Sequence, residues 1–501
     1  MESVAKEHII HKSSMNKIFL YVLWGVLVLS PIIILAVESM IFGKNLLMSV
    51  PEWSDELEYW REVYSFSYHG FSFGGSYFFG HDAALGPLGA HSVTPLVAWG
   101  PFFLLFRSGI NIYIILWINI LYLVVAWGLF VCLVRPDFKQ TAFAILMAYL
   151  FPYTILYLHS SMIEIVCLSG MISFFTLFSK WEYEKKDKKN NTIFVLLIFL
   201  GIWCTLLRPT YVVILFPVIW AKNHYKINLR LAIYLVIYVV LFGVLYKAYS
   251  ITSSVYPNGV MYWLSGIDNY HDKAAYIYRN VYQNMHRYFN PISDDLCQFG
   301  MRIMNLGLMI YSLAVGIVKE KRHKFEGRPE LAVFLVMFGN TVAMILLYDI
   351  VDWRDFRSLS PVVFGCLFFM VIREKNKWLT GVQLAIYALA VSLFIISGDN
   401  NIEIRKNPEY KDLSSYFAEL EQTDEEGNPR TIVFDSTLNW CDISIVSAVP
   451  SQMGYQVFWG AGYDEVYSKA DYVFLPFGVE PSGGVMEMSI PEYGCIYRMF
   501  E

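Results

Sequence analysis

The chain has 501 residues and a net charge of −5, with 56% hydrophobic and only 16% charged residues. A soluble protein carries about 25% charged residues. Because the apolar residues here occur in long runs, the composition excludes an ordinary soluble globular protein. The small negative net charge argues against a nucleic-acid partner. The sequence therefore predicts an α-helical integral membrane protein whose main partner is the lipid bilayer.

The N-terminal segment is a short basic tail followed by the apolar stretch 18–42. A bilayer crossing takes about 20 residues, and no small-residue cleavage site follows this stretch. We interpret it as an uncleaved first helix. Together the apolar runs predict a bundle of about eleven transmembrane helices. They lie at 18–42, 111–134, 140–158, 163–179, 192–207, 210–221, 231–249, 299–318, 331–348, 359–372 and 379–397.

The orientation follows from the Lys and Arg residues of short loops, which stay in the cytoplasm. With these helices, the N-terminal tail and all of the basic loops fall on one side of the membrane. These loops are 135–139, 180–189, 222–230, 319–328 and 373–377. The N-terminus is then cytoplasmic and the C-terminus extracytoplasmic. The outer side receives the long segments 43–110, 250–298 and 398–501.

The apolar segment 93–106 needs a separate interpretation. It contains Pro95, Gly100 and Pro101, and it is too short to cross a bilayer. Counting it as a span would also invert every later loop. We therefore predict an interfacial helix within the first outer loop.

The chain divides into a transmembrane domain at 1–397 and a small extracytoplasmic α/β domain at 398–501. The cues for the second domain are a helical stretch at 413–422 and strands at 431–434 and 472–475. Cys441 and Cys495 are the only cysteines of this domain. They could pair outside the cell, but nothing in the sequence sets the distance between them.

The first outer loop begins with an acidic run in which Asp55, Glu58, Tyr59 and Glu62 recur at helical spacing. These residues share one face of a short helix, close to the first membrane exit. The ordinary interpretation is a solvated acidic surface helix. At this depth, however, a carboxylate walled by aromatic side chains can bind a hydroxyl group and remove its proton.

The order of the sequence motifs resembles a known family. The motif Asp55-Glu56-x-x-Tyr59 follows the first helix, the interfacial segment 93–106 comes next, and a later helix carries Phe-Pro-Tyr near its outer end. In this layout the first 400 residues, roughly, are similar to the GT-C membrane glycosyltransferases. Lipid A aminoarabinose transferases and protein O-mannosyltransferases are examples. The resemblance implies a GT-C-like bundle in which Asp55 is the catalytic base toward the acceptor, with Glu56 beside it and Tyr59 in the substrate site.

The chain departs from the family pattern in the turn before the helix at 163–179. Family members often carry a second acidic residue there, whereas this sequence has His159 and no Asp, and Glu164 is the nearest carboxylate. We assign both residues to the substrate site, although a polar interfacial residue explains His159 equally well. A carboxylate at membrane depth is costly unless it faces a cavity, which favours a functional role for Glu164.

Arginines at two other outer turns complete the predicted site. Arg208 resembles the Lys or Arg that the family places near the donor phosphate, and Arg357 with Pro361 matches the family's Arg-x-x-x-Pro element. A guanidinium can bind a phosphate through two hydrogen bonds. Arg354 is assigned to the same site, but an ion pair with a neighbouring aspartate explains it equally well.

No metal site is assigned. His81, Asp82 and His91 could be metal ligands, yet nothing else at metal-site spacing accompanies them, and loop packing is the better interpretation. Asp294 and Asp295 follow Asn-Pro and are better explained by a turn. A divalent metal stays possible, and no other cofactor is predicted.

The predicted function is a hexosyl- or pentosyltransferase of the plasma membrane. It would move a sugar from a polyprenyl-phosphate donor to an envelope glycan, lipid or protein acceptor at the outer face. The sequence has no Gly-rich phosphate loop for a nucleotide sugar, which favours a lipid-linked donor. Two alternatives are a lipid or polysaccharide flippase or transporter, which would carry charges in mid-helix, and a polysaccharide polymerase or ligase, which would carry His and Arg pairs in a late outer loop.

Overall fold

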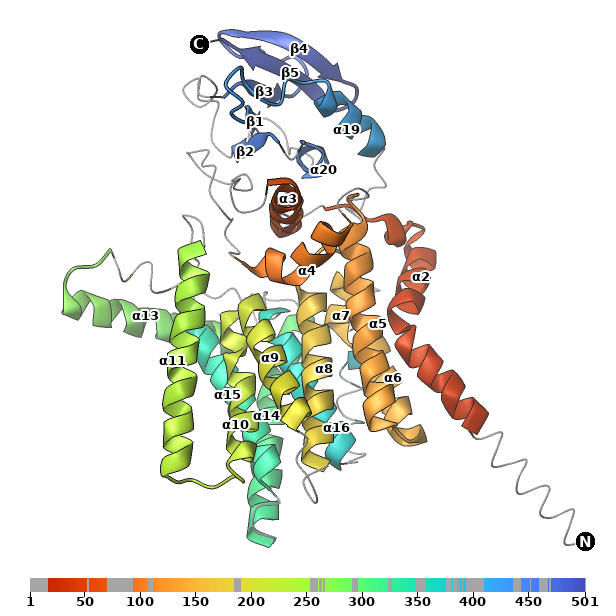
Figure 1. The fold of residues 1–501 in the computed structure, drawn as a ribbon, viewed down its shortest axis with the longest axis vertical. Helices are drawn as coiled ribbons and strands as arrows, with labels where there is room; N and C mark the ends of the chain where they lie inside the picture. Colours follow the sequence, from red (N-terminus) through yellow and green to blue (C-terminus); the bar gives the residue numbers. More distant parts are fainter. Residues whose placement is uncertain are drawn as a thin grey trace, which may run out of the picture.

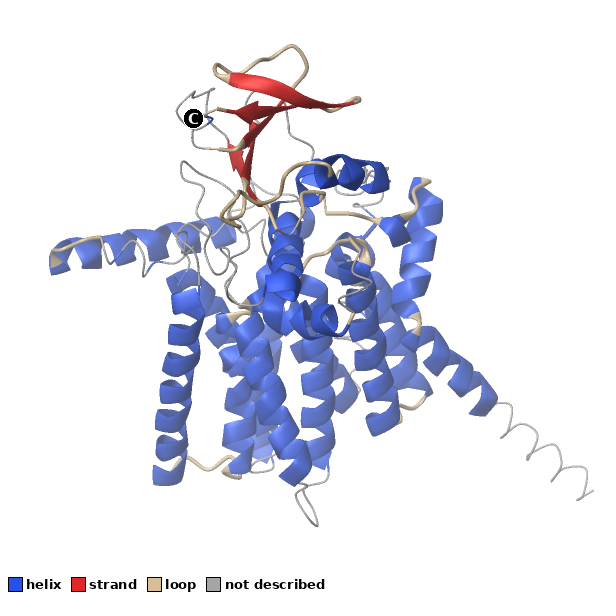
Figure 2. Ribbon diagram, turned by 45° about the horizontal axis from the view of Figure 1, so that its top comes forward, coloured by secondary structure: helices blue, strands red, loops and turns tan. Residues whose placement is uncertain are grey.

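The computed structural model describes the chain in ordered ranges with gaps between them. The described residues are 17–51, 54–69, 93–106, 111–183, 191–252, 260, 264, 266–290, 296–322, 327–347, 357–374, 381, 385, 387–389, 391–392, 410–435, 443–450, 452–458, 467 and 470–500. They are mostly helical, and the named strands all lie in the C-terminal part, as the colours of Figure 2 show.

The helices form an upright bundle with further helices lying across one of its ends (Figure 1). The first helix, Lys17–Val28, is followed by α2 (Ser30–Phe42) and the short turn η1 (Leu46–Met48). The upright helices are α5 (Ile114–Val134), α6 (Phe138–Leu150), α8 (Glu164–Tyr183), α9 (Asn191–Leu207), α10 (Leu215–Lys222), α11 (Leu229–Thr252), α14 (Leu296–Arg322), α15 (Arg328–Leu347) and α16 (Ser360–Glu374). Short elements join them at α7 (Pro152–Tyr157) and η5 (Pro209–Ile214).

Among the described residues, five helices are long and apolar enough to cross a membrane. They lie in α5, α8, α11, α14 and α15, and a sixth span counts if Lys17–Val28 and α2 form one crossing. The other predicted spans are shorter helices of 10–17 residues, except the one at 379–397, which lies largely outside the described residues. The chain therefore has several helices that could span a membrane.

Two predicted single helices are interrupted at prolines. The predicted helix 18–42 bends by 65° after Val28, and Pro31 stands in the first turn of the second piece. The predicted helix 140–158 ends at Leu150, because Phe151 is extended before Pro152 and α7 starts a new helix. A proline lacks the backbone N–H that continues a helix, and Pro152 also disfavours helical backbone at Phe151 before it, so both predictions of continuous helices were wrong.

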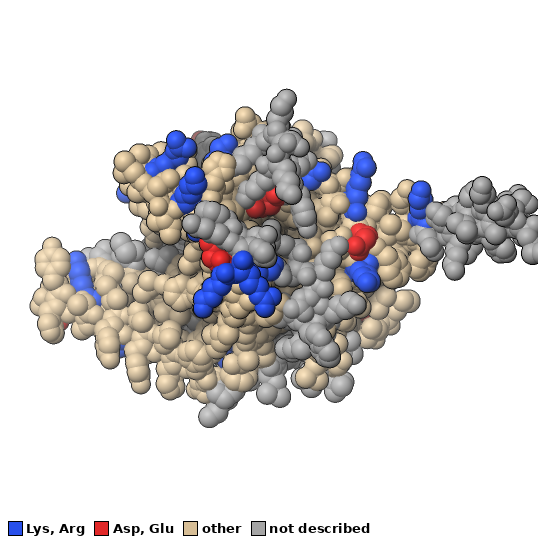
Figure 3. All heavy atoms as spheres, turned by 90° about the horizontal axis from the view of Figure 1, so that it is seen from below, with Lys and Arg blue, Asp and Glu red and all other residues tan. Residues whose placement is uncertain are grey.

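The end of the bundle away from the sheet carries the basic residues. The last turns of α5, α8, α10 and α14 and the first turns of α6, α11 and α15 meet there (Figure 1). These helix ends include Arg135, Lys139, Lys180, Lys222, Arg230, Lys319, Lys321, Arg322 and Arg328. Figure 3 views this end, where Lys and Arg are spread over the surface with few acidic side chains between them.

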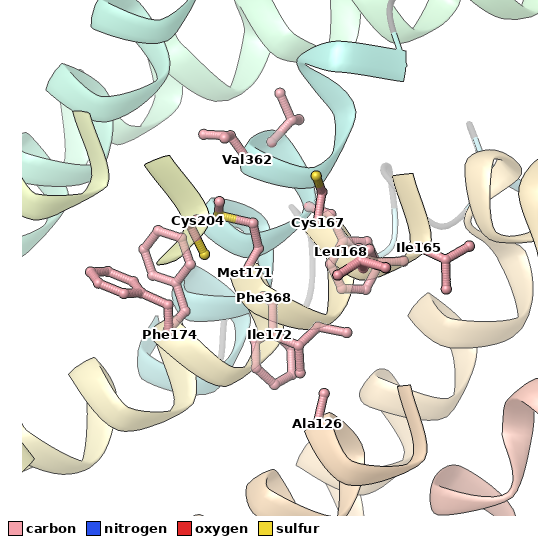
Figure 4. Packing of buried hydrophobic residues seen from close by; sticks show 14 of the residues in the cluster. Ala126, Ile165, Cys167, Leu168, Met171, Ile172, Phe174, Cys204, Val362 and Phe368 are labelled. Atoms are coloured by element: carbon pink, nitrogen blue, oxygen red, sulfur yellow. The ribbon is translucent and has the colours of Figure 1, made fainter. Parts of the chain in front are cut away.

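Helix α8 is the centre of the bundle and packs between α5, α9 and α16. Its buried face includes Cys167, Met171 and Phe174, which Figure 4 shows among side chains of the neighbouring helices. The approach of α16 requires a glycine at position 365, since a Cβ there would lie 2.6 Å from the Phe175 ring. Helix α8 is therefore held on several sides.

Three helices lie across the opposite end of the bundle. They are α3 (Ser54–His69), α4 (Thr94–Leu105) and α13 (Tyr270–Phe289). Helix α4 covers the ends of the upright helices, and α3 lies on α4 (Figure 1). A helix is thus present at 93–106, and its interfacial position stays a prediction. Helix α13 projects sideways at the same level.

The C-terminal domain, taken here as residues 410–500, is a small sheet with helices, and it sits above α3 (Figure 1). The strands are β1 (Thr431–Asp435), β2 (Gly454–Phe458), β3 (Tyr472–Leu475), β4 (Gly484–Ile490) and β5 (Gly494–Met499), in the order β2-β1-β3-β5-β4. The β1 pairings with β2 and β3 are parallel, and β5 is antiparallel to β3 and β4. Helices α19 (Tyr410–Ala418) and α20 (Ile443–Ser447) accompany the sheet.

The predicted elements of this domain agree with the structure at both strands, whereas the predicted helix ends four residues earlier, at Ala418 rather than at residue 422. Cys495 is a buried free thiol in β5, and Cys441 lies outside the described residues.

Candidate active site

The acidic run around Asp55 forms α3, whose first turn contains Asp55 and Glu56. The helix is covered on both sides, by the bundle below and the C-terminal domain above, so Glu56, Glu58 and Glu62 are at most 6% exposed. The solvated surface helix, which was the ordinary interpretation, is therefore wrong. Carboxylates are rarely buried this fully unless they have partners.

Asp55 forms an ion pair with Arg357. The Nη2–Oδ2 distance is 2.8 Å, and the two side chains are 26% and 20% exposed. The two residues are 302 positions apart in the sequence. Arg357 lies just before α16, where the hydroxyl of Ser360 donates a hydrogen bond to its carbonyl oxygen at 3.0 Å. The turn before α16 thus holds the guanidinium against the start of α3.

Glu164 forms a second ion pair, with Arg208. The carboxylate stands in the first turn of α8, is 2% exposed, and lies 2.5 Å from Nη2 of Arg208. The same Glu164 oxygen is 3.7 Å from Nε of Arg357, so one buried carboxylate lies between two guanidinium groups. Glu164 therefore links the Asp55–Arg357 pair to Arg208, and the four residues form one cluster, called here the bundle cluster.

The backbone at Arg208 explains how its side chain is presented. The residue is extended because Pro209 follows it, and it separates α9 from η5. Its Nη1 donates to the hydroxyl of Ser358 at 2.8 Å, and the hydroxyl of Tyr211 donates to the Ser358 carbonyl oxygen at 2.8 Å. Ser358, which follows Arg357 directly, thus ties the two arginine turns together.

Tyr59 lies near the four charged residues of the bundle cluster. It is 2% exposed, and its ring lies 5.4 Å from the ring of Trp99 in α4. Burial raises the pKa of the phenol well above its usual value, and the charges of Asp55 and Glu164 raise it further. Tyr59 therefore stays neutral and keeps its hydroxyl proton at physiological pH.

Glu56 has a different neighbour from Asp55. Its carboxylate accepts a hydrogen bond of 2.6 Å from the backbone N–H of Ser161, in the turn before α8. The buried side chain of Asn119 in α5 also supports this turn, because its amide group donates to the carbonyl oxygens of Ser160 and Met162. Glu56 thus connects α3 to the turn that precedes Glu164.

The remaining predicted residues differ in outcome. His159 is fully buried, with Nδ1 3.8 Å from Oε2 of Glu38 in α2, so it connects the turn before α8 to α2. Arg354 lies outside the described residues. Ser358, Ser161 and Asn119 were not predicted from the sequence. Only Asn119 gave a usable signal, as a lone amide within an apolar run.

No group of three or more His, Cys, Asp or Glu side chains that could hold a metal ion is found among the residues that the structure describes. The metal candidates of the sequence, His81, Asp82, His91, Asp294 and Asp295, lie outside those residues.

The bundle cluster combines an accessible carboxylate with two guanidinium groups, at the end of the bundle away from the basic residues. A carboxylate can accept a proton, and guanidinium groups can bind a phosphate. In comparisons with known proteins, no protein-family model matches the chain, and no curated protein matches it significantly.

Proposed function

We propose that the chain is a membrane glycosyltransferase of the GT-C type, which moves a sugar from a polyprenyl-phosphate carrier to an acceptor at the outer face of the membrane. The observation that supports this proposal is the bundle cluster. Four segments that are distant in the sequence bring one partly exposed carboxylate, Asp55, next to two arginines and one buried carboxylate. A base and an anion-binding pair, side by side, are what transfer from a phosphate leaving group needs.

The reaction would be a single displacement. The Asp55 carboxylate takes the proton of the acceptor hydroxyl while the acceptor oxygen bonds to the anomeric carbon. The bond between that carbon and the phosphate oxygen breaks, and its electron pair leaves with the phosphate. Arg208 and Arg357 stabilise the charge that develops on the leaving group. One displacement inverts the anomeric configuration.

The Asp55–Arg357 ion pair gives the donor a second role. While the pair is formed, the carboxylate is held by the same guanidinium that would bind the phosphate. A donor phosphate competes with Asp55 for Arg357, because both are anions. Donor binding would therefore release the carboxylate for the acceptor, and Glu164 would keep Arg208 and Arg357 in place.

The membrane topology of this proposal keeps about eleven crossings, the shorter helices included. The basic end of the bundle would face the cytoplasm of the plasma membrane, and the bundle cluster and C-terminal domain would face outward. The charge distribution of Figure 3 supports this orientation. Labelling of single cysteines at Lys226 and Asn428 tests it, and labelling of both from the same side would contradict it.

The function is tested with the purified full-length chain in lipid nanodiscs. The probes are radiolabelled polyprenyl-phosphate hexoses and pentoses, with envelope membranes as the source of acceptors. We expect sugar transfer with one class of donor, accompanied by release of polyprenyl phosphate, and little transfer by the Asp55→Asn variant. Movement of the intact donor across the bilayer of proteoliposomes, with no transfer and with equal rates in both proteins, would favour the flippase alternative.

A further inference from the structure

We infer that the C-terminal domain sets the position of Asp55 through α3, and that Arg61 is the positioning residue that joins the two. The inference rests on the proposed function, in which Asp55 is the base. It concerns the face of α3 that points away from the bundle cluster.

The side chain of Arg61 is fully buried between α3 and the C-terminal domain. Its Nη1 donates to the carbonyl oxygen of Val449, and Nη2 donates to that of Met453 at 2.8 Å. Both nitrogens also lie 3.2 Å from the Pro450 carbonyl oxygen. The guanidinium stands 5.0 Å from the centre of the Tyr455 ring. Arg61 thus binds three backbone carbonyl oxygens of the C-terminal domain and also contacts the ring of Tyr455 in β2.

Two neighbours of Arg61 on α3 reach the same domain. The indole N–H of Trp60 donates to the carbonyl oxygen of Ser447, the last residue of α20, at 3.1 Å. Leu57 belongs to the hydrophobic core of the C-terminal domain, together with side chains of α19 and the sheet. The upper face of α3 is therefore part of that domain rather than a surface on which it rests.

The lower face of the same helix holds the bundle. Glu56 binds the backbone of Ser161, and Tyr59 packs on Trp99. Residues 55 and 61 are six positions apart, which is about 9 Å along a helix axis. Because a helix moves as a rigid unit over this length, a shift of the C-terminal domain shifts Asp55 relative to Arg357.

This arrangement gives the outer domain a way to affect the reaction. A misplacement of about 1 Å at a reacting group can lower a rate by about 10²-fold. Arg208 and Arg357 lie on the bundle, so their position does not depend on the contact between Arg61 and the C-terminal domain. Loss of this contact should therefore lower turnover while donor binding is kept.

The test compares the full-length protein in nanodiscs with Arg61→Met, Arg61→Lys and the control Arg430→Met. Arg430 pairs with Asp471 and Glu421 inside the C-terminal domain, so its loss perturbs that domain without touching α3. Hydrogen exchange of α3, read by mass spectrometry without substrate, should become about tenfold faster in Arg61→Met, less so in Arg61→Lys, and should not change in the control. In transfer assays, kcat should fall at least tenfold, roughly, in Arg61→Met, with KM for the donor little changed and partial rescue by Lys.

Unchanged exchange in α3 of Arg61→Met would overturn the inference, as would equal losses of turnover in Arg61→Met and Arg430→Met. If Arg61→Met does not fold, Trp60→Phe removes the hydrogen bond to Ser447 together with part of the buried ring, and it should shift exchange and kcat in the same direction by a smaller factor. Absence of sugar transfer in the wild-type protein would contradict the proposed function. The exchange experiment would still decide whether Arg61 couples the two parts, since it needs no substrate.

Discussion

Among the residues that the structure describes, two of the clusters of arginines and carboxylates differ in what they connect. The bundle cluster brings together residues that are up to 302 positions apart, around a carboxylate that is 2% exposed. The C-terminal cluster joins residues at the rim of the small sheet, around a carboxylate that is 58% exposed. Its members are Glu421, Arg430, Asp471 and Arg498.

The distances in the two clusters are similar, so geometry does not separate them. Arg430 lies 2.9 Å from Asp471 and 3.0 Å from Glu421, close to the 2.8 Å between Arg357 and Asp55. The burial of the central carboxylate does separate them, since Glu164 is 2% exposed and Glu421 is 58% exposed. Exposed ion pairs are screened by water and contribute about 0–1 kcal/mol, whereas a buried charge must be matched by its partner or it destabilises the fold. Removal of the central carboxylate should therefore lower stability far more in the bundle cluster than in the C-terminal cluster.

The largest effect is expected for Asp55→Asn. Asn keeps the size of the side chain and can still accept a hydrogen bond, but it cannot take a proton. General-base catalysis contributes about 10²–10⁴-fold, so turnover should fall by that factor while donor binding is kept. Steady-state transfer assays measure this, with Glu56→Gln as the matched control because Glu56 binds the Ser161 backbone. Near-normal transfer by Asp55→Asn would contradict both the residue assignment and the proposed function.

Glu164→Gln should lower the stability of the bundle. The variant removes the charge between two guanidinium groups and leaves them to repel each other. Loss of a hydrogen bond to a charged partner costs about 1.5–3 kcal/mol, so the thermal unfolding midpoint in detergent should drop clearly. An unchanged midpoint would show that Glu164 does not hold the two arginines.

Arg357→Lys keeps the charge but loses the planar group that reaches Asp55 and Glu164 at the same time. We expect about a tenfold loss of turnover with little change in stability, because an ammonium group cannot reproduce two directed contacts. Arg208→Lys should lose turnover to a similar extent. Equal turnover in Arg357→Lys and the wild type would assign Arg357 a structural role.

Arg430→Lys is the corresponding substitution in the C-terminal cluster, and its effect should be small. The partners of Arg430 are 58% and 31% exposed, so the stability of the protein should change by about 1 kcal/mol at most, and transfer should not change. A loss of turnover as large as that of Arg357→Lys would remove the distinction between the two clusters.

The smallest effect should come from pH at Asp424, a partly exposed residue beside the C-terminal cluster. Hydrogen bonds from the side chain and backbone of Asn428 lower the pKa of this carboxyl below its ordinary value of 3.8. The ionised carboxylate therefore stabilises the turn above pH 3.8, and this contribution is lost as the pH falls through the lowered pKa. As the pH falls through this window, the thermal unfolding midpoint of the wild type should drop slightly more than that of Asp424→Asn. Equal pH profiles of the two proteins would contradict the prediction.

Much of the fold follows from local patterns in the sequence. Apolar runs indicate the upright helices because each backbone hydrogen bond of a helix closes within its own segment. The strands at 431 and 472 follow from β-branched and aromatic residues between turn residues. The interruptions at Pro31 and Pro152 are also local, and they could have been predicted from the prolines alone.

The candidate site could be predicted only in part. The helical spacing and the resemblance selected Asp55, Glu164, Arg208 and Arg357, but not which carboxylate pairs with which arginine. The resemblance assigned the base to Asp55, but helical spacing alone did not separate it from Glu56, although the first lies beside a guanidinium and the second binds a backbone N–H. Neighbours on one helix point in directions about 100° apart, and what they meet depends on the rest of the fold.

The sequence by itself determined that this is a largely helical chain with several possible membrane spans, a basic end and a small C-terminal sheet. The tertiary structure alone decided that α3 is buried between two layers, and that Arg61 and Asp55 face opposite partners. Secondary structure is encoded locally because its hydrogen bonds and periodicity are local. Contacts across 302 and 392 residues are set by how whole helices and domains pack, which no short stretch of sequence contains.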